Sequence, residues 1–283
     1  MLFIDEDIIS DRIDTTIDYQ RSRLELYQEE FELFESMCRA DIREMNMIHE
    51  DASEEEKNKN KEFTWENIKA KIIHLIETAI QFIKKTIENI KKAFIRYRGS
   101  EAVRYYKMNK EKFIPILSNS NIEFSRDFAI PNIDNILHAI SSFNNSKIDF
   151  KEDKVSAEDA YAKIMGTLLN DKDIPKSNLE NYLEDLFLIK STNKHMDGKY
   201  IKRSLELFDK QPFLGVTLAE ACKDKLSTLE DIVKLAPSEY RRNITISIAA
   251  IKDFQSMADK IFIKGTRELD GAVSELYRKI KDK

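Results

Sequence analysis

Isoleucine and phenylalanine recur every three or four residues over a long stretch in the first third of the chain. The positions are Ile72, Ile76, Ile80, Ile83, Ile87, Ile90 and Phe94. Because an α-helix has 3.6 residues per turn, this spacing places them all on one face. The pattern predicts a basic amphipathic helix over residues 63–99, with Thr64 as its N-cap and Gly99 at its end.

A second helical pattern precedes this one. Residues 1–50 are predicted to form an acidic amphipathic helix, with an apolar seam on one face and glutamates on the other. Residues 51–62, DASEEEKNKNKE, hold no apolar residue larger than alanine and are predicted to be a polar linker. A linker of this length permits an antiparallel hairpin. The side chains expected at the helix-packing interface are Leu24, Phe31, Phe34, Ile76, Ile80, Ile83 and Ile87.

The two predicted helices differ in charge. Residues 1–62 carry 19 Asp and Glu against 8 Lys and Arg, whereas residues 63–98 carry 8 Lys and Arg against 3 Glu. An acidic segment followed at once by a basic helix indicates either that the two pair with each other or that each has its own charged partner.

Residues 100–283 are predicted to form a mainly helical domain. The alternation in NIEFSRDFAI, residues 121–130, allows one or two short strands before a helix that follows Pro131. A helix beginning near Ala102 is expected to break before Pro115. Four S/T-x-x-E/D motifs mark expected helix starts, at Ser156, Ser177, Thr217 and Ser227. Residues 244–263 indicate a buried helix and residues 267–283 a charged terminal one. The predicted fold class is therefore mainly α: a long amphipathic helical hairpin, then a helical domain with at most a short β element.

Residue patterns that carry catalytic chemistry are scarce. The chain has six glycines, and its four histidines are not paired at helical spacing. It contains no zinc-protease, phosphate-loop or nucleophile-elbow motif. We therefore expect no enzyme, no cofactor and no metal site. Cys38 and Cys222 are expected to be free thiols, with a disulfide as the alternative. No signal sequence and no apolar run of about 18 residues is evident, so we expect a soluble protein in a cytoplasm.

The basic side of the helix over residues 63–98 has three interpretations. Its cations are Lys84, Lys85, Lys91, Lys92, Arg96 and Arg98. They form a solvated face, contact nucleic-acid phosphates, or lie on an anionic membrane with Trp65, Phe82 and Phe94 inserted. A membrane partner is the least favoured of the three.

Two segments carry a resemblance to a known group of proteins. The segments SMCRADIREMNMIHEDA and FTWENIKAKIIHLIETAIQFIKKTIENIKKAFIRYRG, with the polar gap between them, resemble virion structural proteins of tailed phages from low-GC Gram-positive hosts. The resemblance covers about the first 110 residues. It implies a component of the inner head or assembly core, located in the virion and, during assembly, in the host cytoplasm. The implied partners are other virion proteins (capsid, portal or tail component) and further copies of this chain.

The resemblance also suggests a processing site at Glu50. Ile48-His49-Glu50 looks like the apolar-x-Glu site that prohead proteases of some tailed phages cut. The alternative is that the triplet arises by chance, since it occurs elsewhere in this acidic chain, for example at Ile42-Arg43-Glu44. Position favours Glu50, because it lies at the edge of the predicted linker. The expected function is a structural virion protein that assembles through helix contacts; the alternative is a nucleic-acid or membrane-surface binding module.

Overall fold

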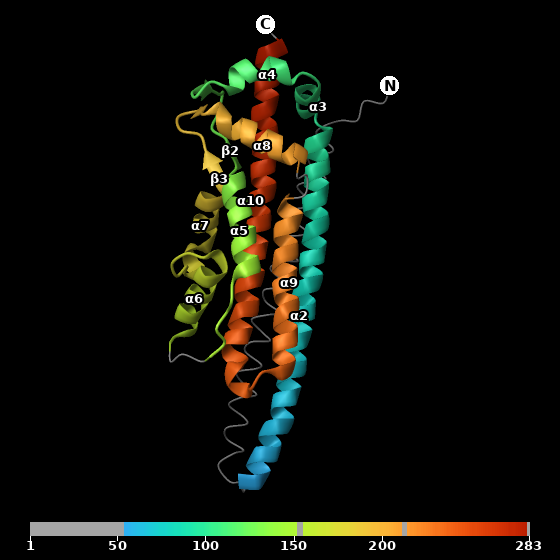
Figure 1. Cartoon of the computed structure of the whole chain (residues 1–283), viewed down its shortest axis with the longest axis vertical. Helices are drawn as coiled ribbons and strands as arrows, with labels where there is room; N and C mark the ends of the chain where they lie inside the picture. The colour runs from blue at the N-terminus through green and yellow to red at the C-terminus, as the bar shows by residue number, and fades with distance from the viewer. Residues whose placement is uncertain (1–53, 152–154, 211–213, 282–283) are drawn as a thin grey trace. The chain divides into compact units, whose positions relative to one another are not determined.

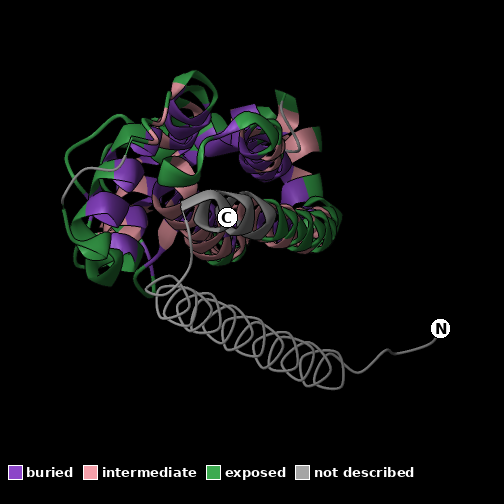
Figure 2. Cartoon of the chain, turned by 90° about the horizontal axis from the view of Figure 1, so that it is seen from below, coloured by how far each residue is buried: buried purple, intermediate pink, exposed green. Residues whose placement is uncertain are grey.

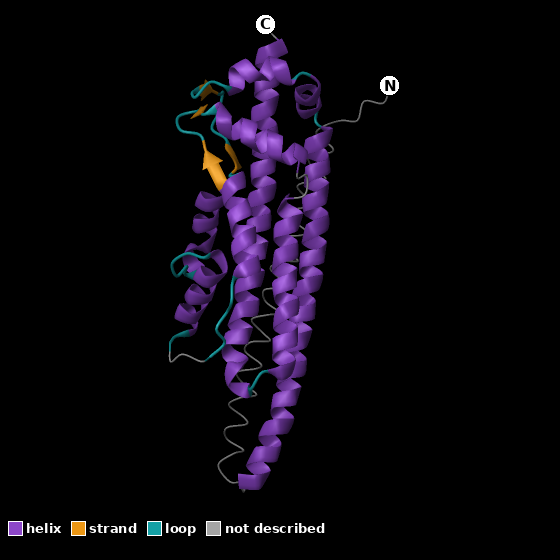
Figure 3. Cartoon of the chain, in the orientation of Figure 1, coloured by secondary structure: helices purple, strands orange, loops and turns teal. Residues whose placement is uncertain are grey.

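The computed structural model describes residues 54–151, 155–210 and 214–281, with the side chains of its first helix from residue 65. Within these residues the fold is mainly α, as predicted, and the strands form two short antiparallel pairs (Figure 3). Residues 67–283 form one compact unit. Of the other unit, residues 1–66, the structure describes the beginning of the first helix. The predicted acidic helix over residues 1–50 lies outside the described residues.

The described helices and strands follow one another along the chain (Figure 1). In order they are α2 (Glu54–Gly99), α3 (Glu101–Met108), α4 (Lys110–Leu117), β1 (Ile122–Glu123), β2 (Ala129–Pro131), α5 (Ile133–Asn145), α6 (Ala157–Leu169), the 3-10 turn η1 (Lys176–Asn178), α7 (Leu179–Phe187), β3 (Leu188–Lys190), β4 (His195–Met196), α8 (Gly198–Lys210), α9 (Leu214–Leu235), the 3-10 turn η2 (Ser238–Tyr240) and α10 (Arg241–Lys281).

Helix α2 ends at Gly99, as predicted, but it begins at Glu54 rather than after Thr64. Residues 54–62 are therefore helical, and the predicted polar linker is wrong over this range. The stretch has no apolar periodicity, but that does not make it a loop. Glutamate and lysine are good helix formers, and acidic residues such as those at positions 54–56 are common near helix N-termini.

The buried side chains of α2 form one continuous seam. They are Ile72, Ile76, Ala79, Ile83, Ile87, Ile90, Phe94 and Tyr97. Ile80, predicted to lie in the seam, is only half-buried, and Ala79 occupies the buried position beside it. Figure 2 shows the same division for the other described helices, whose buried positions lie on the sides that face one another.

The seam of α2 packs against helices from the C-terminal half of the chain. Helix α9 runs alongside α2 in the opposite direction (Figure 1). Near one end of the pair Lys69 Nζ donates to Lys234 O at 3.5 Å, and near the other Ile90 lies against Gly215. Helix α8 covers the end of the seam, where the Phe208 ring packs edge-on against Phe94. The partners predicted for this seam, Leu24, Phe31 and Phe34, lie outside the described residues.

Helix α10 contacts α3, α6, α7, α9 and β2, and it is buried along most of its length. The separate helices predicted over residues 244–263 and 267–283 are in fact this single helix. Gly265 lies between them inside the helix, and its lack of a side chain leaves room for Leu188 of β3. An added Cβ would be 2.7 Å from Leu188 Cδ2.

The helix that begins at Glu101 breaks at Asn109, before Pro115 as predicted, and α4 then continues through the proline. Ser100 caps α3 by accepting a hydrogen bond from Val103 N at 3.3 Å. Pro115 lies inside α4, which ends two residues later at Leu117. A proline near the end of a short helix removes only one of its last hydrogen bonds.

The predicted strands are present as β1 and β2. They pair with β4 and β3 respectively, which come from residues 188–196. A tight turn at Asn193 and Lys194, both with positive φ, lies between β3 and β4. The Asp127 carboxylate accepts hydrogen bonds from Lys194 N at 2.7 Å and Ser191 Oγ at 2.9 Å, which fixes this turn.

The predicted helix starts have mixed outcomes. Ser156 caps α6 as predicted, accepting from Asp159 N at 3.0 Å. Ser177 lies within the turn η1 and caps no helix, while Thr217 and Ser227 lie inside α9. These three predictions are wrong, because the S/T-x-x-E pattern also occurs within helices.

Candidate interaction surface and buried polar cluster

The outer face of α2 carries the cations singled out from the sequence. Lys84, Lys85, Lys92, Arg96 and Arg98 are exposed, and Lys91 is half-buried. At 100° per residue these positions cover roughly half of the helix circumference, opposite the buried seam. Between residues 84 and 98 the sequence holds one acidic residue, Glu88, which accepts a hydrogen bond from Lys91 Nζ at 3.0 Å. We call this set of cations the α2 basic face.

The α2 basic face is about 21 Å long, because fourteen residue steps each rise by ~1.5 Å. A DNA duplex carries one phosphate per ~1.7 Å of its axis, so a face of this length spans about a dozen phosphates. Ile95 interrupts the cations as an apolar side chain that is 65% exposed. A hydrophobic side chain amid cations is a feature of contact surfaces as well as of solvated ones.

The remaining candidate residues have three different outcomes. Ile76, Ile83 and Ile87 are buried in the seam of α2. Glu50, the proposed processing site, lies outside the described residues. The aromatic set invoked for membrane insertion is divided, since Phe94 is buried against Phe208.

A polar cluster that the sequence interpretation missed lies between α2, α9 and α10. Asp259 and Gln255 belong to α10 and are 4% and 0% exposed. Gln255 Nε2 donates to Asp259 Oδ1 at 2.5 Å. Within the described structure, Asp259 Oδ2 and Gln255 Oε1 have no hydrogen-bond partner. The signal in the sequence was two polar residues, four positions apart, on the helix face that also holds the apolar residues Ile251 and Ala258.

The surroundings of this cluster raise the pKa of both Asp259 and the nearby Cys222. Burial raises the pKa of Asp259 to about 8, although hydrogen bonding with Gln255 and Thr86 acts in the opposite direction. Burial, and then the charge of Asp259, raise the pKa of the Cys222 thiol on α9. Cys222 is a free, buried thiol in the described structure, and Cys38 lies outside the described residues. Asp259 and Cys222 therefore both favour their protonated forms.

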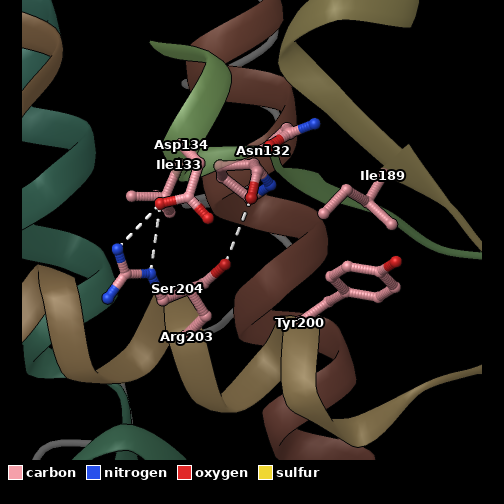
Figure 4. Close-up of a pocket in the computed structure, with 8 residues that line it drawn as sticks. Asn132, Ile133, Asp134, Ile189, Tyr200, Arg203 and Ser204 are labelled. Carbon is pink, nitrogen blue, oxygen red and sulfur yellow. Dashed lines mark hydrogen bonds and ion pairs between the residues drawn. The ribbon is translucent and has the colours of Figure 1, made fainter. Parts of the chain in front are cut away.

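One small pocket lies where β2 and the start of α5 meet α8 (Figure 4). Its volume is about 130 Å³, below the roughly 300 Å³ of a small-ligand site. Two hydrogen bonds join residues of its lining. Arg203 Nη2 donates to Asp134 Oδ1 at 2.7 Å, and Ser204 Oγ donates to Pro131 O at 3.1 Å. These bonds tie α8 to β2 and to the start of α5.

Among the described residues, no three His, Cys, Asp or Glu side chains come together as metal ligands would. No described helix combines the length and apolarity needed to span a bilayer.

Comparison with known proteins identifies no relative: no protein-family model, no curated protein and no solved structure matches this chain.

Proposed function

We propose that this chain is a non-enzymatic structural protein of a tailed-phage particle, in which α2 contacts a neighbouring component through its outer face. The observation that carries the proposal is the division of α2 into two faces. Its apolar seam packs within its own bundle, and its outer face presents the α2 basic face with the exposed Ile95. The resemblance of residues 1–110 supplies the particle as the setting.

The test is peptide mass spectrometry of purified particles from a phage that encodes the chain. We expect the chain at a fixed number of copies relative to the major capsid protein, together with other virion proteins. Cross-linking within the particle should join lysines of the α2 basic face to a neighbour. Particles that lack the chain after gradient purification would contradict the proposal.

A second candidate function, phosphate binding, is favoured by the same cations. Cations clustered on one helix face bind a polyanion by releasing its counterions, so affinity falls with rising salt. Binding to a duplex of about 20 base pairs should weaken steeply between about 50 and 200 mM salt. The variant Lys92→Ala, Arg96→Ala, Arg98→Ala should reduce the slope of log affinity against log salt by about 2 to 3.

A matched control removes three exposed cations elsewhere in the described structure: Lys147→Ala, Lys172→Ala, Lys260→Ala. This variant has the same net charge as the α2 variant, so general electrostatics affect both equally. If both variants lose affinity to the same extent, the α2 basic face is not a specific phosphate site. If the wild type does not bind at low salt, phosphate binding is ruled out and the structural proposal is unaffected.

A further inference from the structure

We propose that Asp259 is a proton-binding site in the core of the bundle, and that its bound proton holds α2 against α9 and α10. The proposal concerns the stability of the bundle and does not depend on the proposed function.

The first argument is the pair of unsatisfied atoms. Asp259 Oδ1 already accepts from Gln255 Nε2, and the two oxygens without a partner, Asp259 Oδ2 and Gln255 Oε1, belong to the same two side chains. Two acceptors cannot bond to each other. If Oδ2 carries a proton, it donates to Gln255 Oε1, and acid and amide close a ring that satisfies both atoms. A buried acceptor left unsatisfied costs about 1–3 kcal/mol, so this ring is favoured.

The second argument concerns Thr86, the neighbour on α2. Its Oγ1 donates its hydrogen to Phe82 O at 2.8 Å, one turn earlier in the same helix. With its hydrogen donated to Phe82 O, the hydroxyl cannot also donate to an ionised Asp259. An ionised Asp259 would need the hydroxyl to turn away from Phe82 O. The protonated acid therefore leaves this bond of α2 in place, while its one hydrogen satisfies Gln255 Oε1 on α10.

The third argument is the lack of compensation for a charge. Among the described residues, the side chains that interact with Asp259 are Gln255 on its own helix, Thr86 on α2 and Cys222 on α9. The first two are neutral, and the thiol of Cys222 is itself kept protonated by burial. An ionised carboxylate at this position would be a buried charge without a cation, so ionisation should separate α2 from α9 near Thr86.

The test compares Asp259→Asn with the wild type across pH. Asparagine keeps the shape and neutrality of the protonated acid, and its amide can form the same ring with Gln255. The ratio of the unfolding constants, wild type over variant, should grow by up to about tenfold per pH unit between about pH 5 and pH 8. The exposed Asp224→Asn on α9 is the control, whose ratio should stay constant. A constant ratio for Asp259→Asn would overturn the proposal.

A second measurement covers the case in which Asp259→Asn does not fold. Burial also raises the pKa of Asp270, so the sample is Asp270→Asn with Asp259 intact. Its infrared spectrum should retain a protonated-carboxyl band at pH 6, where exposed carboxylates are ionised, and lose it near pH 8. A spectrum without that band at pH 6 would refute the bound proton.

A third measurement tests whether α2 separates from α9. It compares the rate at which the Cys222 thiol is alkylated, in chains that all carry Cys38→Ser. At pH 9 the reaction with a neutral reagent should be faster in the chain that keeps Asp259 than in the Asp259→Asn variant. The direction is informative, because the charge of Asp259 raises the pKa of Cys222 and by itself slows its alkylation. Equal or slower reaction with Asp259 present would show that ionisation does not open the bundle.

Discussion

Ile90 of α2 lies directly against Gly215 of α9: a Cβ added at Gly215 would be 3.0 Å from Ile90 Cγ2 and 2.6 Å from Phe262 Cε1 of α10. Helices α2, α9 and α10 therefore meet at Gly215, where α9 has no side chain to separate them. The Gly215→Ala variant should lower the free energy of unfolding by about 1–3 kcal/mol, because the core must move to admit the methyl group.

Gly99→Ala is the control for this substitution, since nothing lies within 4 Å of the added Cβ. Alanine is the better helix former, so this variant should be neutral or more stable by about 0.5–1 kcal/mol. Urea denaturation measures both. If the two variants are equally stable, α2 and α9 are not in close contact at Gly215.

Ile83 and Ile80 test the position of the seam. Ile83 is 0% exposed, whereas Ile80 is half-buried. Ile83→Ala should cost about 2–5 kcal/mol of unfolding free energy, as expected for a buried side chain, and Ile80→Ala clearly less. Denaturant midpoints measured at one pH compare them. The reverse order would place Ile80 rather than Ala79 in the seam.

Phe94 and Phe208 test the contact between α2 and α8. Their ring centroids are 5.5 Å apart at an interplanar angle of 85°. A double-mutant cycle with leucine at each position should give a coupling free energy of about 0.5–1.5 kcal/mol, since this edge-to-face geometry is favourable beyond burial alone. Additive losses would mean that the two rings do not interact.

The dependence of stability on pH should reflect two opposing sets of carboxyl groups. Burial raises the pKa of Asp209, but hydrogen bonds from Lys107 and Lys110 lower it by more. A lowered pKa contributes stability that is lost as the pH falls through the folded-state value. Asp259 has the opposite sign, because its raised pKa, about 8, contributes stability that is lost as the pH rises toward that value.

The wild type should accordingly be most stable near about pH 4 to 5 and lose stability toward pH 8. Asp259→Asn should move the maximum toward neutral pH. Thermal melting across this range measures the effect. A wild type that melts at a higher temperature at pH 8 than at pH 5 would show that Asp259 does not dominate the profile.

The parts of the fold that depend on local sequence were predictable. The seam of α2, its end at Gly99 and the strands within residues 121–130 all follow from periodicity and from residues that end helices. The start of α2 was not, because a charged stretch with good helix formers has no apolar signal. Periodicity also shows that a face is buried without showing which helix buries it, and contacts such as Ile90 with Gly215 join residues far apart in sequence.

Of the two candidate sites, one could be predicted from the sequence and the other only in part. The cations of the α2 basic face were predictable, since they lie opposite a regular seam, although Lys91 is half-buried. The polar cluster at Asp259 was detectable as a pair four residues apart, but its unsatisfied atoms become visible only in three dimensions. The close approach of Leu188 of β3 to Gly265 of α10 likewise joins residues far apart in sequence, which no local pattern records.

The most direct measurement of the central claim, that α2 belongs to the bundle through its seam, is amide hydrogen exchange on the full chain. Residues 72–97 of α2 should be protected to the same degree as residues 215–233 of α9, because the two helices open only together. Rapid exchange throughout residues 72–97, with α9 and α10 still protected, would contradict the claim and separate α2 from the bundle.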